Sequence, residues 1–165
     1  MKKLFALLLT AALLASLPLT ALAADSTVNY DENRQSQTSG LNVTYQVAPA
    51  FTVTIPADVT LNNSVTVSAA DVVVEYGKAV NVTISGTSGE NNAFQLRTDE
   101  GAVLASTVKK GDAEVRVGDT VLSVTPTSDQ TAVELTFVEP ENYTYAGLYK
   151  GTVTFTVSVD TTGNP

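Results

Sequence analysis

Carboxylates are the side chains of this chain whose spacing could support acid–base chemistry. A glycosidase places two carboxyl groups across a cleft from each other and often raises the pKa of one of them. Close pairs of acidic residues include Asp31 with Glu32, Asp99 with Glu100, and Glu139 with Glu141. These pairs lie in stretches whose composition indicates turns, where acidic residues commonly serve solubility. We therefore expect no catalytic pair among them.

The chain contains no histidine and no cysteine. Ser-His-Asp and Cys-His catalysis, thiol redox chemistry and ordinary zinc sites all need these residues, so the composition argues against each of them. A serine–lysine dyad stays open by residue type, although no motif supports it. There is no glycine-rich phosphate loop, and the acidic stretches lack the alternating oxygen ligands of a calcium loop. We expect a protein that is not an enzyme and needs no cofactor or metal.

Tyrosines supply the remaining candidate contacts for a ligand. Tyr143 and Tyr145 lie in one loop-like stretch and could stack on a sugar, although loop tyrosines also commonly pack against the end of a sandwich. The chain has no tryptophan, which is the best stacking surface. Tyr149 follows Gly147 at the entrance to a strand. This placement fits a tyrosine corner, in which the hydroxyl bonds back to the main chain.

Residues 1–23 have the layout of a secretory signal peptide. Two lysines precede an apolar run over residues 4–14, and Ala21 and Ala23 supply the small residues of a cleavage site. The alternative, a membrane anchor, needs about 20 apolar residues, and this run is much shorter. We expect cleavage after Ala23 and a protein that is extracellular or at the cell surface, with no membrane anchor after cleavage.

Removal of this leader takes away two lysines and changes the formal net charge from −8 to −10. Phosphate binding requires a basic face, so the charge argues against a nucleic-acid partner. It also argues against docking on an anionic membrane. Solubility outside the cell is the simplest role for such a charge.

The composition of the mature chain changes at residue 41. Residues 24–40 are polar and predict a flexible arm, whereas residues 41–160 are rich in valine and threonine that alternate with period two. Residues 161–165 form a short tail. About eight to ten short strands with closely spaced turns predict an all-β, immunoglobulin-like antiparallel β-sandwich. Uneven strand lengths and prolines at strand edges make a closed barrel less favoured.

Two stretches of the chain resemble a known group of proteins. They are "FTVTIPADVTL" at 51–61 and "AGLYKGTVTFTVSV" at 146–159. They resemble small secreted or cell-surface β-sandwich proteins of Gram-positive bacteria, which share a VTIP…AGxYxGxVTFxV pattern. The last strand is also distantly similar to that of the WxL surface domain, whose naming tryptophan is absent here. The resemblance implies a non-enzymatic extracellular role.

The first alternating stretch suggests how the protein could assemble. Leu41, Val43, Tyr45 and Val47 alternate with polar residues and follow a flexible tether. Such a strand can leave its own sheet and complete the edge of a neighbour, which makes it a candidate assembly strand in a structural or adhesive protein. The more common arrangement is pairing within its own domain. The other candidate is a soluble carbohydrate- or cell-wall-binding module. Partners would be copies of this chain, other surface proteins, or a surface glycan.

Overall fold

The computed structural model describes residues 41, 43–89 and 93–162 of the chain. This part of the chain is all-β and contains no helix, as expected from the alternation. In particular, none of the described residues forms a helix that is long and apolar enough to cross a membrane. The leader at 1–23, the arm at 24–40 and residues 163–165 of the tail lie outside the described residues. The strands are β1 Ala50–Thr54, β2 Ser64–Val73, β3 Lys78–Thr87, β4 Gln95–Arg97, β5 Val103–Ala105, β6 Thr107–Lys110, β7 Ala113–Val115, β8 Thr120–Val124, β9 Ala132–Val138 and β10 Val153–Thr161.

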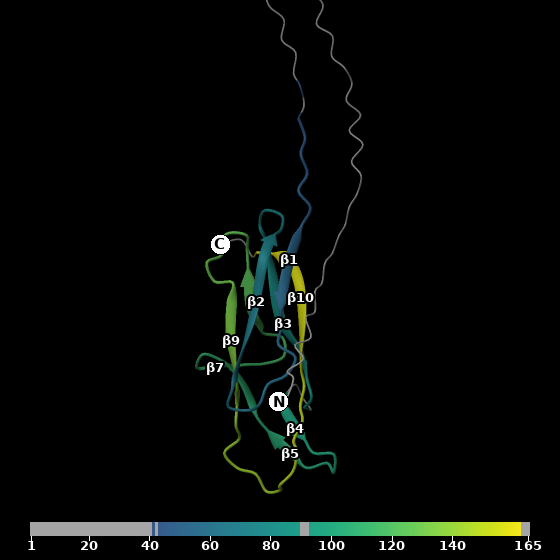
Figure 1. Cartoon of the computed structure of the whole chain (residues 1–165), viewed down its shortest axis with the longest axis vertical. Coiled ribbons are helices and arrows are strands. Elements are labelled where there is room, and N and C mark those ends of the chain that lie inside the picture. The colour runs from purple at the N-terminus through teal and green to yellow at the C-terminus, as the bar shows by residue number, and fades with distance from the viewer. Residues whose placement is uncertain (1–40, 42, 90–92, 163–165) are drawn as a thin grey trace, which may run out of the picture.

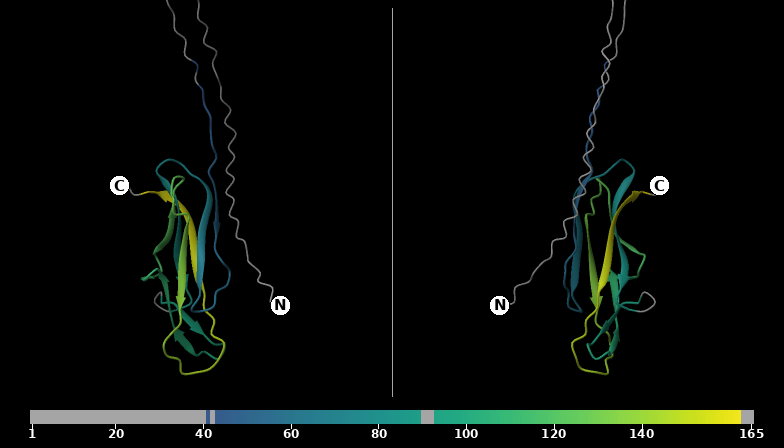
Figure 2. Two further views of the ribbon diagram at one scale, coloured as in Figure 1. Left: turned by 60° about the vertical axis from the view of Figure 1, so that its left-hand side comes forward. Right: turned by 90° about the vertical axis from the view of Figure 1, so that its right-hand side faces the viewer.

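These strands form two main sheets and a small hairpin. The larger sheet has the order β1-β2-β9-β6-β7, the second has the order β10-β3-β8, and β4 pairs with β5. Every pairing between these strands is antiparallel. Figure 1 and Figure 2 show an elongated domain with the β4–β5 hairpin at one end, beside the loop that joins β9 to β10.

The two main sheets enclose one apolar core. Strand side chains point alternately to opposite faces, so every second residue of a strand can face the opposite sheet. The largest fully buried side chains come from both sheets: Val67, Val108 and Leu135 from one, and Val80, Val82, Ile84, Val121 and Val124 from the other. They belong to a single continuous cluster. The fold is therefore a β-sandwich, which confirms the predicted class.

An aromatic contact joins the β4–β5 hairpin to this core. The rings of Phe94, next to β4, and Phe137, on β9, meet edge to face with their centroids 5.7 Å apart. Leu96 of β4 is also buried in the core cluster. An isolated two-stranded hairpin is only marginally stable in water, so this packing holds the hairpin on the sandwich.

The predicted strand at 41–47 is not a strand in the structure. Among the described residues no strand begins before Ala50, and the alternating side chains lie in solvent. The exposed fractions are 87% for Leu41, 83% for Val43, 91% for Tyr45 and 62% for Val47. The expectation that this stretch pairs within its own domain is therefore wrong. Alternating side chains suit a stretch to a sheet, but pairing also needs a sheet edge that the stretch can reach.

No strand lies between β1 and β2, and Leu61 and Asn62 form a turn there. Asn62 adopts a left-handed conformation with φ of 64°. Its main-chain N–H donates to the carbonyl oxygen of Phe137, 2.7 Å away. This contact with β9, remote in sequence, fixes the turn between β1 and β2.

Candidate functional site

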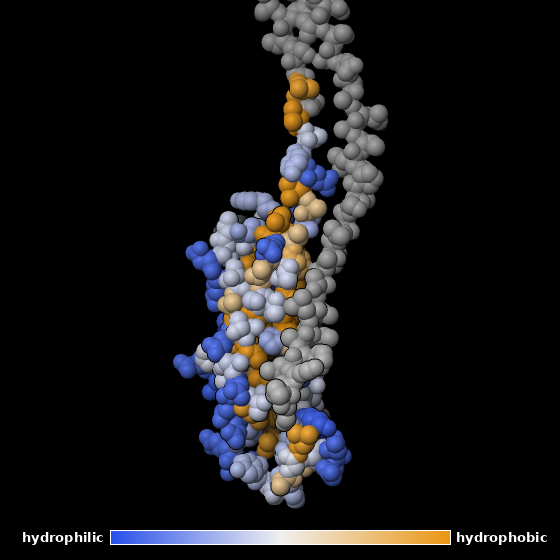
Figure 3. Space-filling model, in the orientation of Figure 1, coloured by the Kyte–Doolittle hydropathy of each residue, from blue (hydrophilic) through white to orange (hydrophobic). Residues whose placement is uncertain are grey.

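The most exposed apolar stretch of the described chain is the N-terminal segment, which we define as residues 41–49. It continues directly from the start of β1 and runs away from the sandwich (Figures 1 and 2). Apolar residues, in orange, alternate along it with more polar residues, in white and blue, and its upper part stands clear of the domain surface (Figure 3). Exposed apolar side chains in a row are costly in water and commonly mark an interaction surface.

The local sequence explains why the N-terminal segment continues in line with β1. Ala48 precedes Pro49, and a residue before proline is confined to extended conformations. A tight hairpin turn needs positive φ angles, which glycine and asparagine adopt most readily. Residues 46–50 contain neither. A sharp reversal at this point is therefore disfavoured.

The ends of the two main sheets are the places where another strand could pair. Three of the four edge strands are protected in ways that natural sheets use. Strand β1 has five residues and lies between Pro49 and Pro56. Strand β7 has three residues and carries Glu114 at its centre. At β8, the Nζ of Lys110 donates to the carbonyl oxygen of Val121, 2.9 Å away.

The fourth edge strand, β10, has none of these protections. It has nine residues and pairs on one side only, with β3. Within β10, no proline and no charged residue precedes Asp160. Its alternate side chains Val153, Phe155 and Val157 pack against the core and remain only half-buried. Strand β10 is therefore a long edge with apolar side chains that are partly open to solvent.

A hydrogen-bonded carboxylate stands at the end of β10. Asp160 accepts hydrogen bonds from the hydroxyl of Ser158, at 2.5 Å, and from the side-chain amide of Asn81, at 3.2 Å. The Ser158 hydroxyl, followed by the Asn81 amide, lowers the pKa of Asp160 below its ordinary value of 3.8. The negative charge thus lies near the C-terminal end of β10, away from its apolar positions.

The loop between β9 and β10 holds the tyrosines singled out from the sequence. Tyr143 and Tyr145 are both exposed, with their neighbour Leu148. The hydroxyl of Tyr149 donates to the carbonyl oxygen of Tyr145, 2.8 Å away. The prediction that Tyr149 bonds back to the main chain is confirmed. Tyr143 and Tyr145 are therefore available for a ligand, whereas Tyr149 holds the loop.

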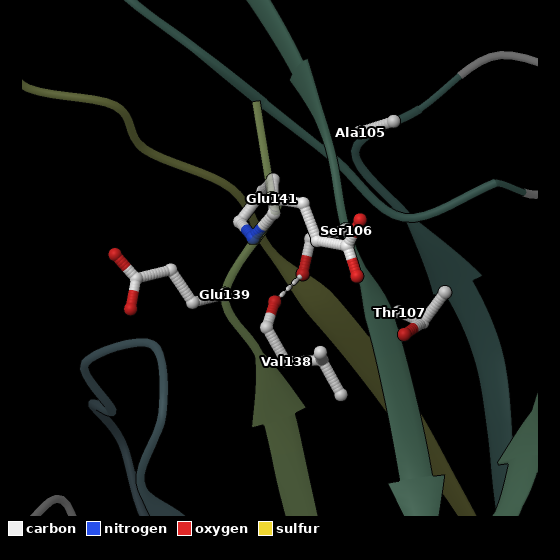
Figure 4. Close-up of a pocket in the computed structure, with 7 residues that line it drawn as sticks. Ala105, Ser106, Thr107, Val138, Glu139 and Glu141 are labelled. Carbon is white, nitrogen blue, oxygen red and sulfur yellow. Dashed lines mark hydrogen bonds between the residues drawn. The ribbon is translucent and has the colours of Figure 1, made fainter. Parts of the chain in front are cut away.

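A hollow of about 220 Å³ lies between the start of β6 and the end of β9 (Figure 4). Among the residues that line it, Ser106 donates its hydroxyl to the carbonyl oxygen of Val138. The Glu139 carboxylate accepts from the Asn62 side-chain amide at 2.7 Å. The carboxylates of Glu139 and Glu141 point in opposite directions in Figure 4. This pair does not converge on one point as a glycosidase pair would.

The pair Asp99 and Glu100 does not line this hollow. Asp99 is exposed and forms an ion pair with the Nζ of Lys150 at 3.3 Å. Its neighbour Glu100 is exposed in the same turn. The pair Asp31 and Glu32 lies outside the described residues. Exposed ion pairs of this kind contribute little to stability.

Sequence reasoning identified the N-terminal segment and missed the β10 edge. The alternation of β10 was visible in the sequence, but alternation occurs in central and edge strands alike. The uncharged run from Val153 to Val159 is more typical of a central strand, since edge strands normally carry charges or prolines, so the sequence held no signal for this edge.

Comparison of the chain with protein-family models, with curated proteins and with solved structures finds no match. The resemblance to Gram-positive surface proteins therefore stays a prediction from the quoted stretches.

Proposed function

We propose that this protein is a non-enzymatic structural or adhesive protein, outside the cell or at its surface, that assembles by strand exchange of its N-terminal segment. The observation that carries the proposal is the state of Leu41, Val43, Tyr45 and Val47. They alternate as in a strand that buries one face, yet each is exposed and unpaired in its own sandwich. An added strand gains main-chain hydrogen bonds from a sheet edge and places alternate side chains into it.

The composition of the N-terminal segment distinguishes it from a simple spacer. Flexible linkers are rich in glycine, serine or charged residues, and stiff ones are rich in proline. Residues 41–49 contain no glycine, no serine and no charge, and they include one proline. Covering one such apolar side chain stabilises a complex by about 1.5–3 kcal/mol. Burial of these side chains against a partner would therefore be favourable.

Size-exclusion chromatography with light scattering tests this proposal. Three forms are compared: residues 24–165, residues 41–165 without the polar arm, and residues 50–165 without the arm and the N-terminal segment. We expect oligomers from the first two forms and a monomer from the third. All described strands lie between Ala50 and Thr161, so the third form should retain its β spectrum by circular dichroism. Monomers in all three forms would reject assembly.

The exposure of Tyr143 and Tyr145 in one loop favours a second candidate, a soluble module that binds carbohydrate or cell wall. Two neighbouring rings open to solvent can stack on sugar units. Binding of the mature protein to purified wall polysaccharide, compared with a Tyr143→Ala, Tyr145→Ala variant, tests this role. A monomeric protein whose binding is lost in the variant would favour the module over the assembly.

A further inference from the structure

We propose that the free edge of β10 is the acceptor for the N-terminal segment of a second copy of this chain. This inference rests on the proposed function and names its partner surface. A strand can join a sheet only at an edge strand. Among the described strands, β10 is the edge that combines length, absence of charge before Asp160 and half-buried apolar side chains.

The position of β10 in the sandwich supports a vacant place beside it. In immunoglobulin-type sandwiches a tyrosine corner precedes strand F, and the smaller sheet has the order C-F-G. Here Tyr149 forms such a corner just before β10, and β10 pairs with β3, the third strand of the chain. Strand β10 thus corresponds to F beside C, while β8 adds a strand on the other side of β3. The place of G, on the other side of β10, is open in the described structure.

The segment and the edge match in length and in pattern. Nine residues, 41–49, can lie antiparallel to the nine residues of β10. In the register that aligns both stretches fully, Val43 lies opposite Val159, Tyr45 opposite Val157 and Val47 opposite Phe155. The alternating side chains then cover the half-buried face of β10. A slip of one residue would turn every one of them to the other face.

Charge also permits this pairing. The segment at 41–49 carries no charged residue, and β10 carries only Asp160. Asp160 would therefore meet no like charge across the new pair. Pairing of apolar, uncharged strands is the arrangement that unprotected edges favour.

Chain direction favours a second copy over the same chain. Strand β1 begins at the end of the sandwich where β10 finishes (Figure 1). The segment could reach β10 of its own chain only after a sharp reversal near Pro49, and it would then run parallel to β10. A segment from a second copy needs no reversal and can run antiparallel, as every described strand pair does.

Disulfide trapping tests the edge and the register together. The natural chain has no cysteine, so introduced cysteines react without competition. In the aligned register Gln46 lies opposite Thr156 on the solvent face, close enough for a disulfide. Mature Gln46→Cys protein is unfolded, mixed with mature Thr156→Cys protein, refolded and exposed to a mild copper oxidant. We expect a linked pair of the two variants on a non-reducing gel.

Two matched mixtures supply the controls. Thr54→Cys replaces Thr156→Cys to probe the edge of β1, and Thr44→Cys replaces Gln46→Cys to probe a shifted or parallel register. The expected yield of linked pair is several-fold lower in each. A stronger product with Thr54→Cys overturns the β10 edge, and one with Thr44→Cys overturns the register; assembly stands in both cases. Monomers by light scattering with no linked product reject the acceptor and the assembly together.

Discussion

The hydroxyl of Tyr149 fastens the loop that leads into β10. It donates to the carbonyl oxygen of Tyr145 across 2.8 Å, while its ring packs partly against the core cluster. The loop from residue 139 to residue 149 is otherwise mostly exposed. The Tyr149 hydrogen bond therefore fastens the loop just before Lys150, whose main chain pairs with that of Arg97 at the entrance to the edge strand.

Replacement of Tyr149 by phenylalanine should remove this bond and keep the ring packing. We expect the free energy of unfolding to fall by about 0.5–1.5 kcal/mol, the usual net value of one hydrogen bond. Urea unfolding followed by circular dichroism measures the change. Tyr143→Phe, at an exposed ring, is the matched control and should change stability by less than about 0.5 kcal/mol. Equal losses in both variants would contradict a specific role for Tyr149.

Asp160 makes the stability of the folded domain depend on pH. Hydrogen bonds from Ser158 and Asn81 lower the pKa of Asp160 in the folded state below 3.8, so folding favours the charged form. The resulting stabilisation is fully present above the unfolded pKa. It is lost as the pH falls through the lower folded pKa.

Asp160→Asn should therefore reduce the loss of stability on acidification. We expect the melting temperatures of the variant and the natural protein to converge as the pH drops below about 4. Thermal unfolding monitored between neutral pH and pH 3 gives the comparison. Asp129→Asn, in an exposed turn, controls for the general effect of removing a negative charge. A difference in melting temperature between the variant and the natural protein that does not change with pH would refute the assigned hydrogen bonds.

At the scale of the element, β10 depends on a close approach at its entrance. Gly151 lies against the β4 strand, and a Cβ atom at this position would come within 2.8 Å of the Gln95 carbonyl oxygen and 3.0 Å of the Ser88 hydroxyl. That hydroxyl donates to Gln95 and accepts from the main-chain N–H of Thr152. There is no room for a side chain without disturbing this bridge.

Gly151→Ala should consequently destabilise the sandwich by about 1–3 kcal/mol, as expected for overpacking. Gly86→Ala is a matched control inside β3, where the new Cβ atom would have its nearest neighbour at an ordinary 3.7 Å, on Thr154. Alanine there should be neutral or raise stability by about 0.5–1 kcal/mol, because glycine weakens strand interiors. Urea midpoints of the two variants measure the contrast. A Gly151→Ala variant as stable as the natural protein would show that β10 does not need this contact.

At the scale of the whole molecule, the described domain is a closed core with two open features, the N-terminal segment and the β10 edge. Its core residues come mainly from both main sheets and are buried without the segment. The sandwich can therefore fold alone and still offer both features to a neighbour. Each copy would then act as donor on one side and as acceptor on the other, an arrangement that builds chains of subunits.

Val43→Asp should weaken this assembly without destabilising the single domain. Val43 is exposed in its own chain, so its replacement should leave the unfolding midpoint of the isolated domain unchanged. In the paired state its side chain would be buried, and losing about 1.5–3 kcal/mol per subunit contact lowers affinity about tenfold or more. Light scattering over a concentration series measures the association.

Thr44→Asp is the control for this prediction. Thr44 neighbours Val43 and points to the opposite face of an extended segment, so a charge there should remain in solvent after pairing. Its assembly should be close to that of the natural protein. Equal weakening by both substitutions would indicate general charge repulsion and would argue against burial of the Val43 face.

Much of the fold could be read from local patterns. The period-two alternation over residues 41–160 predicted strands, and the structure shows one of them as β3, with Val80, Val82 and Ile84 buried at its centre. Gly147 and Tyr149 likewise predicted the hydrogen bond back to the main chain. These features were predictable because the two faces of a strand and the reach of one tyrosine are set by neighbouring residues.

The sequence by itself determined the all-β class, the buried faces and the tyrosine corner. It also contained the apolar pattern at 41–47. Only the tertiary structure decided that this pattern stays unpaired, that β10 is an edge, and that Asn62 turns the chain beside Phe137. The physical reason is that side-chain alternation depends on adjacent residues, whereas a place in a sheet depends on hydrogen bonds between strands far apart in the chain.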